Sequence, residues 1–189
     1  LLLTNNVMIA NTLKLQSGIL NVNAKVLTLR STTAKTARLA KVESGASLSG
    51  NITVQRALGS GYRWHYFGTP VKSQTFATIQ NANFAAYYTY DFTTAVDKGW
   101  VAVSSMAQSL APGRGVIGFG GGSFATTGLP VIGDGAGNNA GNFNFSVGYD
   151  ENGWENAGGF KGWNLLANPY PSEISWETMA RNAQIDNVF

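Results

Sequence analysis

The N-terminal part of the chain, residues 1–55, places hydrophobic residues in short alternating pairs. Leu13 and Leu15 form one pair, and Leu27 and Leu29 form another fourteen positions later. Residues two apart along a strand lie on the same face, so each pair indicates a short strand. Because the pairs recur, the pattern predicts either the rungs of a partial solenoid or a β-meander of ordinary antiparallel strands.

Aromatic residues carry the alternation in the middle of the chain. Tyr62, Trp64 and Tyr66 share one face of a predicted strand, and His65 lies on its other face. A second segment repeats the pattern with Tyr88, Tyr90 and Phe92. Alternation of this kind is typical of strands that are buried on one face. We expect the rings to form the core between two stacked sheets.

Two further elements are predicted towards the C-terminus. Residues 143–149 alternate aromatic or aliphatic residues with small or polar ones, which predicts a half-buried strand. A single short helix is predicted at residues 176–182, because Ser175 is a favourable N-cap and Glu177 is favourable beside the N-terminal dipole.

These patterns together predict an all-β fold in two parts. Residues 1–50 form a repetitive segment, either a short-strand β-meander or a partial solenoid, and residues 51–189 form an antiparallel, jelly-roll-like β-sandwich. Residues 187–189 resemble the start of another strand, so we expect a sandwich that is truncated at its C-terminus. The remainder of a longer parent chain, or a neighbouring protein, would cover the open edge.

Composition and charge narrow the class of protein. Only 12% of the 189 residues are charged and 44% are hydrophobic, which is not typical of an intrinsically disordered chain. The net charge of +3 comes without a run of Lys or Arg, so no nucleic-acid partner is expected. Polar residues interrupt each apolar stretch before the roughly 18 residues that a membrane-spanning helix needs. The absence of cysteine excludes disulfides and thiolate metal sites.

Two glycine-rich stretches are candidate loops or bulges. Residues 118–123 lack the Lys and Ser or Thr of a phosphate-binding loop, so their glycines are expected to allow a bulge or a close backbone approach. In residues 133–139, Asp134, Asn138 and Asn139 could offer oxygen ligands to a structural calcium ion. A loop between strands is the preferred interpretation, because the stretch holds one carboxylate. No other cofactor is expected.

A catalytic centre is difficult to assemble from this sequence. Asp150, Glu151 and Glu155 are the acidic cluster that could act as paired carboxylates. His65 is the only histidine, and no nucleophile-elbow motif accompanies it, so it is interpreted as an ordinary strand residue. We therefore expect a protein that is not an enzyme, with a hydrolase as a minor alternative.

The abundance of Trp and Tyr offers a different function. Their rings stack on the apolar faces of sugars, while Asn and Asp can hydrogen-bond sugar hydroxyls. Trp100, Trp154 and Tyr87 are the candidate residues of such a glycan-binding platform. Aromatic residues of a β-sandwich more often form its core, and the solvent exposure of the rings decides between the two interpretations.

Three stretches of the sequence together carry a family resemblance. They are residues 50–56 with residues 64–71, the A-P-G-R-G run at 111–115, and the G-W-N-L-L-A-N-P-Y-P run at 162–171, which is followed by Ser172 and Trp176. The combination resembles large secreted surface proteins of the Bacteroidota. Such proteins are typically exported by the type IX secretion system, and carry adhesin-like β regions followed by a β-sandwich.

The residues behind the resemblance are expected to have structural roles. They are Trp64, Pro70, Trp163, Asn168, Pro169, Tyr170, Pro171 and Trp176. The two prolines of residues 168–171 each fix a φ angle and bias the preceding residue towards extended geometry, which predicts a stiff corner.

The resemblance implies a non-enzymatic domain with an adhesive or structural role. Its implied location is the extracellular cell surface, which it reaches as cargo of type IX secretion. The implied partners are the rest of the parent chain or a neighbouring surface or secretion protein. The alternative is a glycan-binding module attached to a larger secreted enzyme, with glycans as its ligands.

Overall fold

A computed structural model describes residues 1–94, 96–132, 143–149, 162–177 and 179–180. These residues form an all-β fold, in which the helical elements are two short 3-10 helices. In chain order the elements are β1 (Val7–Ile9), β2 (Thr12–Leu13), β3 (Gly18–Asn21), β4 (Leu27–Leu29), β5 (Arg38–Leu39), β6 (Ala46–Ser49), β7 (Ile52–Phe67), β8 (Gln74–Thr75), η1 (Phe76–Thr78), β9 (Asn83–Tyr90), η2 (Val96–Gly99), β10 (Trp100–Ala102), β11 (Ser109–Leu110) and β12 (Val116–Gly128).

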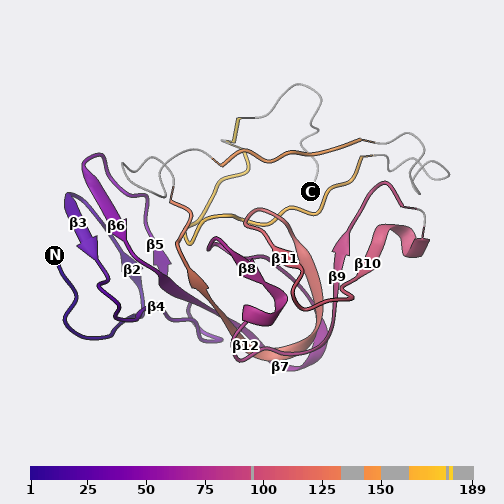
Figure 1. Ribbon diagram of the computed structural model, residues 1–189, viewed down its shortest axis with the longest axis horizontal. Coiled ribbons are helices and arrows are strands. Elements are labelled where there is room, and N and C mark those ends of the chain that lie inside the picture. The colour runs from indigo at the N-terminus through magenta and orange to yellow at the C-terminus, as the bar shows by residue number, and fades with distance from the viewer. Residues whose placement is uncertain (95, 133–142, 150–161, 178, 181–189) are drawn as a thin grey trace.

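The first six strands stack as the turns of a small parallel solenoid (Figure 1). β1 pairs with β4 and β4 with β7, while β2 pairs with β5 and β3 with β6, and all four pairings are parallel. Parallel pairing selects the solenoid and not the antiparallel meander. The predicted repeat of fourteen residues is wrong, because each turn contains three strands: Val7 lies opposite Leu27 and Leu13 opposite Leu39.

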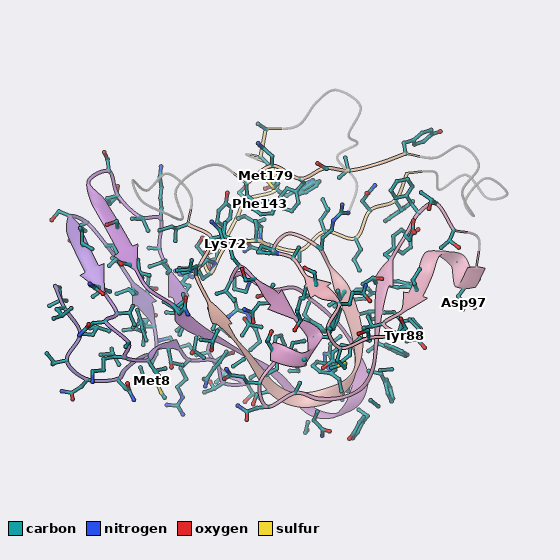
Figure 2. The ribbon with its side chains drawn as sticks, in the orientation of Figure 1. Met8, Lys72, Tyr88, Asp97, Phe143 and Met179 are labelled. Atoms are coloured by element: carbon teal, nitrogen blue, oxygen red, sulfur yellow. The ribbon has the colours of Figure 1, made fainter. Side chains whose placement is uncertain are left out.

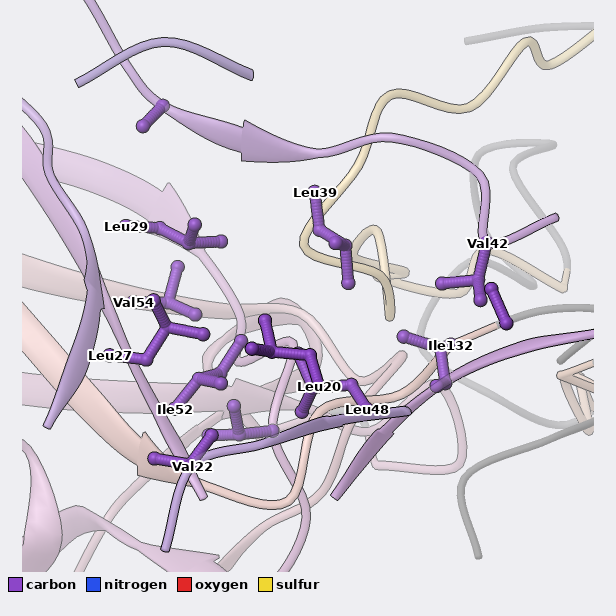
Figure 3. Packing of buried hydrophobic residues seen from close by; sticks show 13 residues of the cluster. Leu20, Val22, Leu27, Leu29, Leu39, Val42, Leu48, Ile52, Val54 and Ile132 are labelled. Carbon is purple, nitrogen blue, oxygen red and sulfur yellow. The ribbon is translucent and has the colours of Figure 1, made fainter. Parts of the chain in front are cut away.

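Aliphatic side chains fill the interior of the solenoid (Figure 3). Leu27 and Leu29 of the second predicted pair are each 1% exposed, as are Ile52 and Val54, which alternate in the same way on β7. Leu13 and Leu15 of the first pair are partly buried against the cluster. The complete cluster contains Leu20, Val22, Leu27, Leu29, Ala37, Leu39, Val42, Ala46, Leu48, Ile52, Val54, Val71 and Ile132.

Strand β7 leaves the solenoid and becomes the first strand of a curved antiparallel layer, in which it pairs with β12 (Figure 1). The six-stranded sheet has the order β1-β4-β7-β12-β9-β10, and its last four strands are antiparallel. The small sheet of β8 and β11, together with η1, lies on the concave side of this curve. The two layers give the sandwich-like arrangement that the sequence predicts.

The curvature coincides with glycines in the two longest strands. The register of β7 and β12 shifts on both sides of Gly122, which lies opposite Gly59 with positive φ angles of 86° and 80°. Such bulges bend a strand and increase its twist. A Cβ atom on Gly120 would lie 2.1 Å from the Asn83 carbonyl oxygen. The expectation of a bulge or close backbone approach at residues 118–123 is therefore confirmed.

A second, mainly aromatic core fills the space between the curved sheet and η1. Phe67 stacks on Phe84 with ring centroids 5.2 Å apart and contacts Phe124 at 5.0 Å. The buried members of the cluster are Phe76, Ile79, Tyr87, Leu110, Val116 and Phe124.

The predicted strand at residues 143–149 is wrong, because this segment forms no β-ladder. Its alternation reflects packing at its first residues only: the rings of Phe143 and Phe145 cover Gly113, where a Cβ atom would lie 2.5 and 2.8 Å from them. Val147 is 39% exposed and Tyr149 is 59% exposed.

The predicted helix at residues 176–182 is also wrong for its described part, where residues 176, 177, 179 and 180 form a bend and a turn. Ser175 Oγ donates a hydrogen bond to the Glu177 carboxylate at 2.8 Å.

Candidate functional site

The convex side of the curved sheet is aromatic and open to solvent. On β7, Tyr62 is 56% exposed, Trp64 51% and Tyr66 64%. The three occupy alternate positions of the strand and therefore share one side, while Phe67 and His65 take the other. The expectation that this row forms the core is wrong, because Phe67, Phe84 and Phe124 already fill the concave side.

Neighbouring strands extend the row across the sheet. The register places Phe119 of β12 opposite Trp64, and Trp100 of β10 opposite Tyr90 of β9. Figure 2 shows the labelled Tyr88 projecting outward from β9. We call this surface the aromatic face; its members are Tyr62, Trp64, Tyr66, Tyr88, Tyr90, Trp100 and Phe119.

Contacts between the rings hold the aromatic face in place. Trp64 lies 5.1 Å from Phe119 and 5.6 Å from Tyr88 between ring centroids, and the second contact is edge-on. Trp100 links Tyr66, at 6.2 Å, to Tyr90, at 5.3 Å. Tilted and edge-on contacts between aromatic rings are favourable. The rings are thus supported by one another while Tyr62, Trp64 and Tyr66 remain more than half exposed.

The aromatic face carries polar ring atoms but no charge. At the outward positions of these strand segments, the register places the aromatic residues with Ile117 and alanines, and no charged residue among those described. The Tyr62 hydroxyl donates a hydrogen bond to Asn83 Oδ1 at 3.0 Å. Within the described ranges, the hydroxyls of Tyr66 and Tyr88 have no hydrogen-bond partner in the protein.

The three residues of the predicted glycan platform do not come together. Trp100 lies on the aromatic face. Tyr87 does not, because it alternates with Tyr88 on β9 and is buried at 8% exposure in the second core, where burial raises the pKa of its phenol. Trp154 lies outside the described residues. The prediction for Tyr87 is therefore corrected.

The predicted calcium ligands Asp134, Asn138 and Asn139 lie outside the described residues. So does the carboxylate cluster of Asp150, Glu151 and Glu155. In the part of the chain that is described, no group of three His, Cys, Asp or Glu side chains could hold a metal ion.

His65 points to the concave side of β7, opposite Gly118. Its Nε2 atom is buried and, among the described residues, has no hydrogen-bond partner. The register places no serine or carboxylate opposite it, so the description of His65 as a strand residue fits its surroundings.

The three stretches behind the family resemblance converge in space. A Cβ atom on Gly68 would lie 2.4 Å from the Ala167 Cβ atom and 3.1 Å from the Arg114 carbonyl oxygen. The Gly115 N–H donates to the Leu165 carbonyl at 3.0 Å, and the Ala167 N–H donates to the Gly113 carbonyl at 3.0 Å. Gly68, residues 113–115 and residues 165–167 therefore build one structural junction, which begins directly after the end of β7.

The proline corner at residues 168–171 docks this junction on the solenoid. The Leu39 N–H of β5 donates to the Pro171 carbonyl at 2.8 Å, where the next strand of the solenoid would bind. Pro169 and Pro171 are buried. The Tyr170 hydroxyl accepts a hydrogen bond from the Phe143 N–H at 2.9 Å, and Tyr170 N–H donates to Asn168 Oδ1 at 2.9 Å.

The other predicted motif residues have mixed environments. Pro70 is buried just after β7 ends, which fits its predicted position at a strand end. Trp176 is partly buried, whereas Trp163 is 48% exposed. Trp64 belongs to the aromatic face and not to the junction.

Two surface hollows in the described part of the chain lie elsewhere. One borders the solenoid at Val22, Gly50 and Asn51, and the other lies between Leu39 and Pro171. Neither is lined by a residue of the aromatic face. No helix in the described part is both long and apolar enough to cross a membrane.

Most members of the aromatic face could be grouped from the sequence, because they alternate along their strands. The alternation of Tyr62, Trp64 and Tyr66 shows that they share a side, but alternation does not say which side faces water. Phe119 could not be grouped in this way, because it lies between glycines and joins the others only through strand pairing.

A protein-family model described as a domain of unknown function (DUF8693) matches residues 4–188. No curated protein and no solved structure matches the chain.

Proposed function

The chain belongs to the DUF8693 family, and we propose that it is a non-enzymatic adhesive domain of an extracellular surface protein, which makes contact through its aromatic face. The proposal includes export as cargo of the type IX secretion system. A structural role in the parent protein is assigned to the solenoid and the junction, and adhesion is assigned to the convex side of the sheet.

The exposure of the aromatic face is the observation that carries the adhesive role. Large contiguous apolar patches are rare on the surfaces of soluble monomers, and they mark interaction sites. Tyr62, Trp64 and Tyr66 are each more than half exposed, although the same strand also has a buried side. Burial of such rings against a partner releases water from apolar surface and is favourable.

The motifs of the junction support the proposed location. The stretches that resemble secreted surface proteins of the Bacteroidota are residues 50–56 with 64–71, residues 111–115 and residues 162–171, and parts of all three, although not residues 50–56, meet at the junction. The resemblance therefore follows a structural unit, and export by type IX secretion is proposed on that ground.

Adhesion is tested with beads that carry the 189-residue chain on a film of whole extracellular matrix from the producing bacterium. We expect Trp64→Ala with Tyr66→Ala to reduce bead retention at least tenfold. The matched control is Trp163→Ala with Tyr149→Ala, because these rings are similarly exposed, at 48% and 59%, but lie outside the aromatic face. Equal retention of both variants and the unaltered chain would overturn the adhesive role.

Location is tested separately by treating intact cells with a protease and identifying the released peptides. We expect peptides of this chain from cells with a working type IX system and none from cells that lack its outer-membrane translocon. Detection of the protein in the cytosol alone would refute the proposed route.

A glycan-binding module of a larger secreted enzyme is the second candidate function. The position of Trp100 on the aromatic face favours it. The two candidate functions differ in the activity they expect of the parent protein. If the full-length parent hydrolyses the polymer that this chain binds, the glycan-binding module is favoured over the adhesive domain.

A further inference from the structure

We infer that the aromatic face binds an uncharged, extended polysaccharide chain. The inference rests on the proposed function, because it names the ligand of the same surface.

The composition of the aromatic face fits sugars. Six of its seven members are Tyr or Trp, and one is Phe. A pyranose has an apolar C–H face that stacks on an aromatic ring and an equatorial rim of hydroxyls, so it needs both apolar surface and hydrogen-bonding groups. The Tyr66 and Tyr88 hydroxyls, which have no protein partner among the described residues, supply such groups. An aliphatic patch would supply none.

The arrangement of the rings favours a polymer over a small ligand. Alternate residues on a strand are about 6.7 Å apart, so Tyr62, Trp64 and Tyr66 form a row of three rings along β7. Trp100 and Tyr90 continue the contacts beyond Tyr66. Pockets for small molecules enclose most of the ligand, whereas this row lies on a convex surface. A linear chain can bind to several such rings in succession.

The absence of charge argues against the other polymers that stack on aromatic rings. Proteins that bind single-stranded nucleic acids combine aromatic platforms with a positively charged groove. Binding to anionic lipids or acidic glycans likewise depends on Lys and Arg. The outward positions of β7, β9, β10 and β12 hold no charged residue among those described. A neutral ligand is therefore the electrostatic match.

A protein partner fits the surface less well. Protein interfaces concentrate their binding energy in anchors, mostly Trp, Tyr and Arg, that fill well-packed pockets. Neither of the two hollows described above is lined by a residue of the aromatic face, and the face contains no Arg. The experiment must therefore distinguish binding to a protein from binding to a polysaccharide.

The inference is tested by isothermal titration calorimetry of the 189-residue chain with the neutral hexasaccharides cellohexaose and xylohexaose. We expect binding of at least one of them, weakened at least tenfold by Trp64→Ala and less than threefold by Trp64→Phe, which keeps an aromatic ring. Trp163→Ala, the equally exposed control, should change affinity less than twofold. An acidic galacturonate hexasaccharide and vesicles containing phosphatidylserine should not bind.

The same bead assay separates this inference from the proposed function. Before the film is used, one sample is digested with protease and another is oxidised with periodate, which cleaves sugar rings that carry two neighbouring hydroxyls, as 1,4-linked glucose and xylose do. We expect retention to survive protease and to disappear after periodate. Retention that depends on Trp64 but disappears after protease would overturn the polysaccharide and leave the adhesive role intact. Loss of any dependence on Trp64 would overturn both.

Discussion

The two sides of the curved sheet are both aromatic, but they use different rings. The concave side and its cover hold Phe67, Phe76, Phe84, Tyr87 and Phe124, of which four are Phe. The convex side holds the aromatic face, in which Phe119 is the only Phe. Phe has no polar atom and can be buried without a hydrogen-bond partner, whereas Tyr and Trp have a polar tip that benefits from water or a ligand.

This difference separates rings that stabilise the fold from rings that are available for binding. The same strands build both sides, so the strand propensity of a segment cannot explain why its rings are buried on one side and exposed on the other. On the concave side, Phe84 packs on Gly118 and Gly120, where a Cβ atom would lie 2.7 to 2.8 Å from its ring. Glycine thus makes room for a buried Phe, while the convex side has open solvent in front of it.

The largest predicted effect is a loss of stability from the concave side. Phe124→Ala removes a ring that is 3% exposed and contacts Phe67 and Phe84, and should lower the free energy of unfolding by about 3–5 kcal/mol. Phe119→Ala, on the convex side of the same strand, is the matched control and should cost about 1–2 kcal/mol. Urea denaturation measures both. Equal losses would remove the distinction between the two sides.

The second effect concerns the glycines beneath the buried rings. In Gly118→Ala, the new methyl group would lie 2.7 Å from Phe84 and 3.1 Å from Phe67, and overpacking of this kind should cost about 1–3 kcal/mol. Ser123→Ala, an exposed position of the same strand, should change stability by less than about 0.5 kcal/mol. Thermal unfolding of the two variants checks this, and an unchanged Gly118→Ala variant would mean that Phe84 is not closely packed.

A smaller effect is expected on the convex side. Tyr66→Ser removes a ring that is 64% exposed, and should lower the free energy of unfolding by no more than about 1 kcal/mol. Solubility should rise, because an exposed apolar ring is lost. Denaturation and concentration-dependent light scattering measure the two quantities. Unfolding of this variant at room temperature would assign Tyr66 to the fold and not to binding.

The smallest effect is a pH dependence at the alkaline end. Burial raises the pKa of Tyr87 above its ordinary value of 10.0, so the folded state holds the phenolic proton more tightly than the unfolded state. The unfolded state therefore loses this proton first, and stability should fall as the pH rises above about 10. Tyr87→Phe should weaken this fall. A pH series of melting temperatures for both proteins measures the contribution, and identical slopes would exclude it.

The all-β fold class and the strands that form the first core could be predicted from the sequence. Leu27, Leu29, Ile52 and Val54 are buried as their alternation indicates. The sequence did not supply the repeat length of the solenoid, because a spacing between two similar pairs cannot show how many strands form each turn. Leu13 of β2 pairs with Leu39 of β5, although β3 and β4 lie between these two strands in the sequence.

The candidate site was only partly predictable, for a related reason. Alternation assigned Tyr62, Trp64 and Tyr66 to one side, but which side is buried depends on what other segments supply, here Phe84 and Phe124. Residues 143–149 show the opposite case. Their alternation is genuine at Phe143 and Phe145, yet it arises from packing on Gly113 and not from strand pairing.

Hydroxyl-radical footprinting of the free chain and of the chain bound to a neutral hexasaccharide tests the central claim most directly. In the free chain, we expect rapid oxidation of Tyr62, Trp64 and Tyr66 and slow oxidation of Phe124 and Tyr87. In the complex, the first three should become protected while Trp163 continues to react. Protection of Trp64 in the free chain, or its unchanged oxidation in a complex that has formed, would contradict the account.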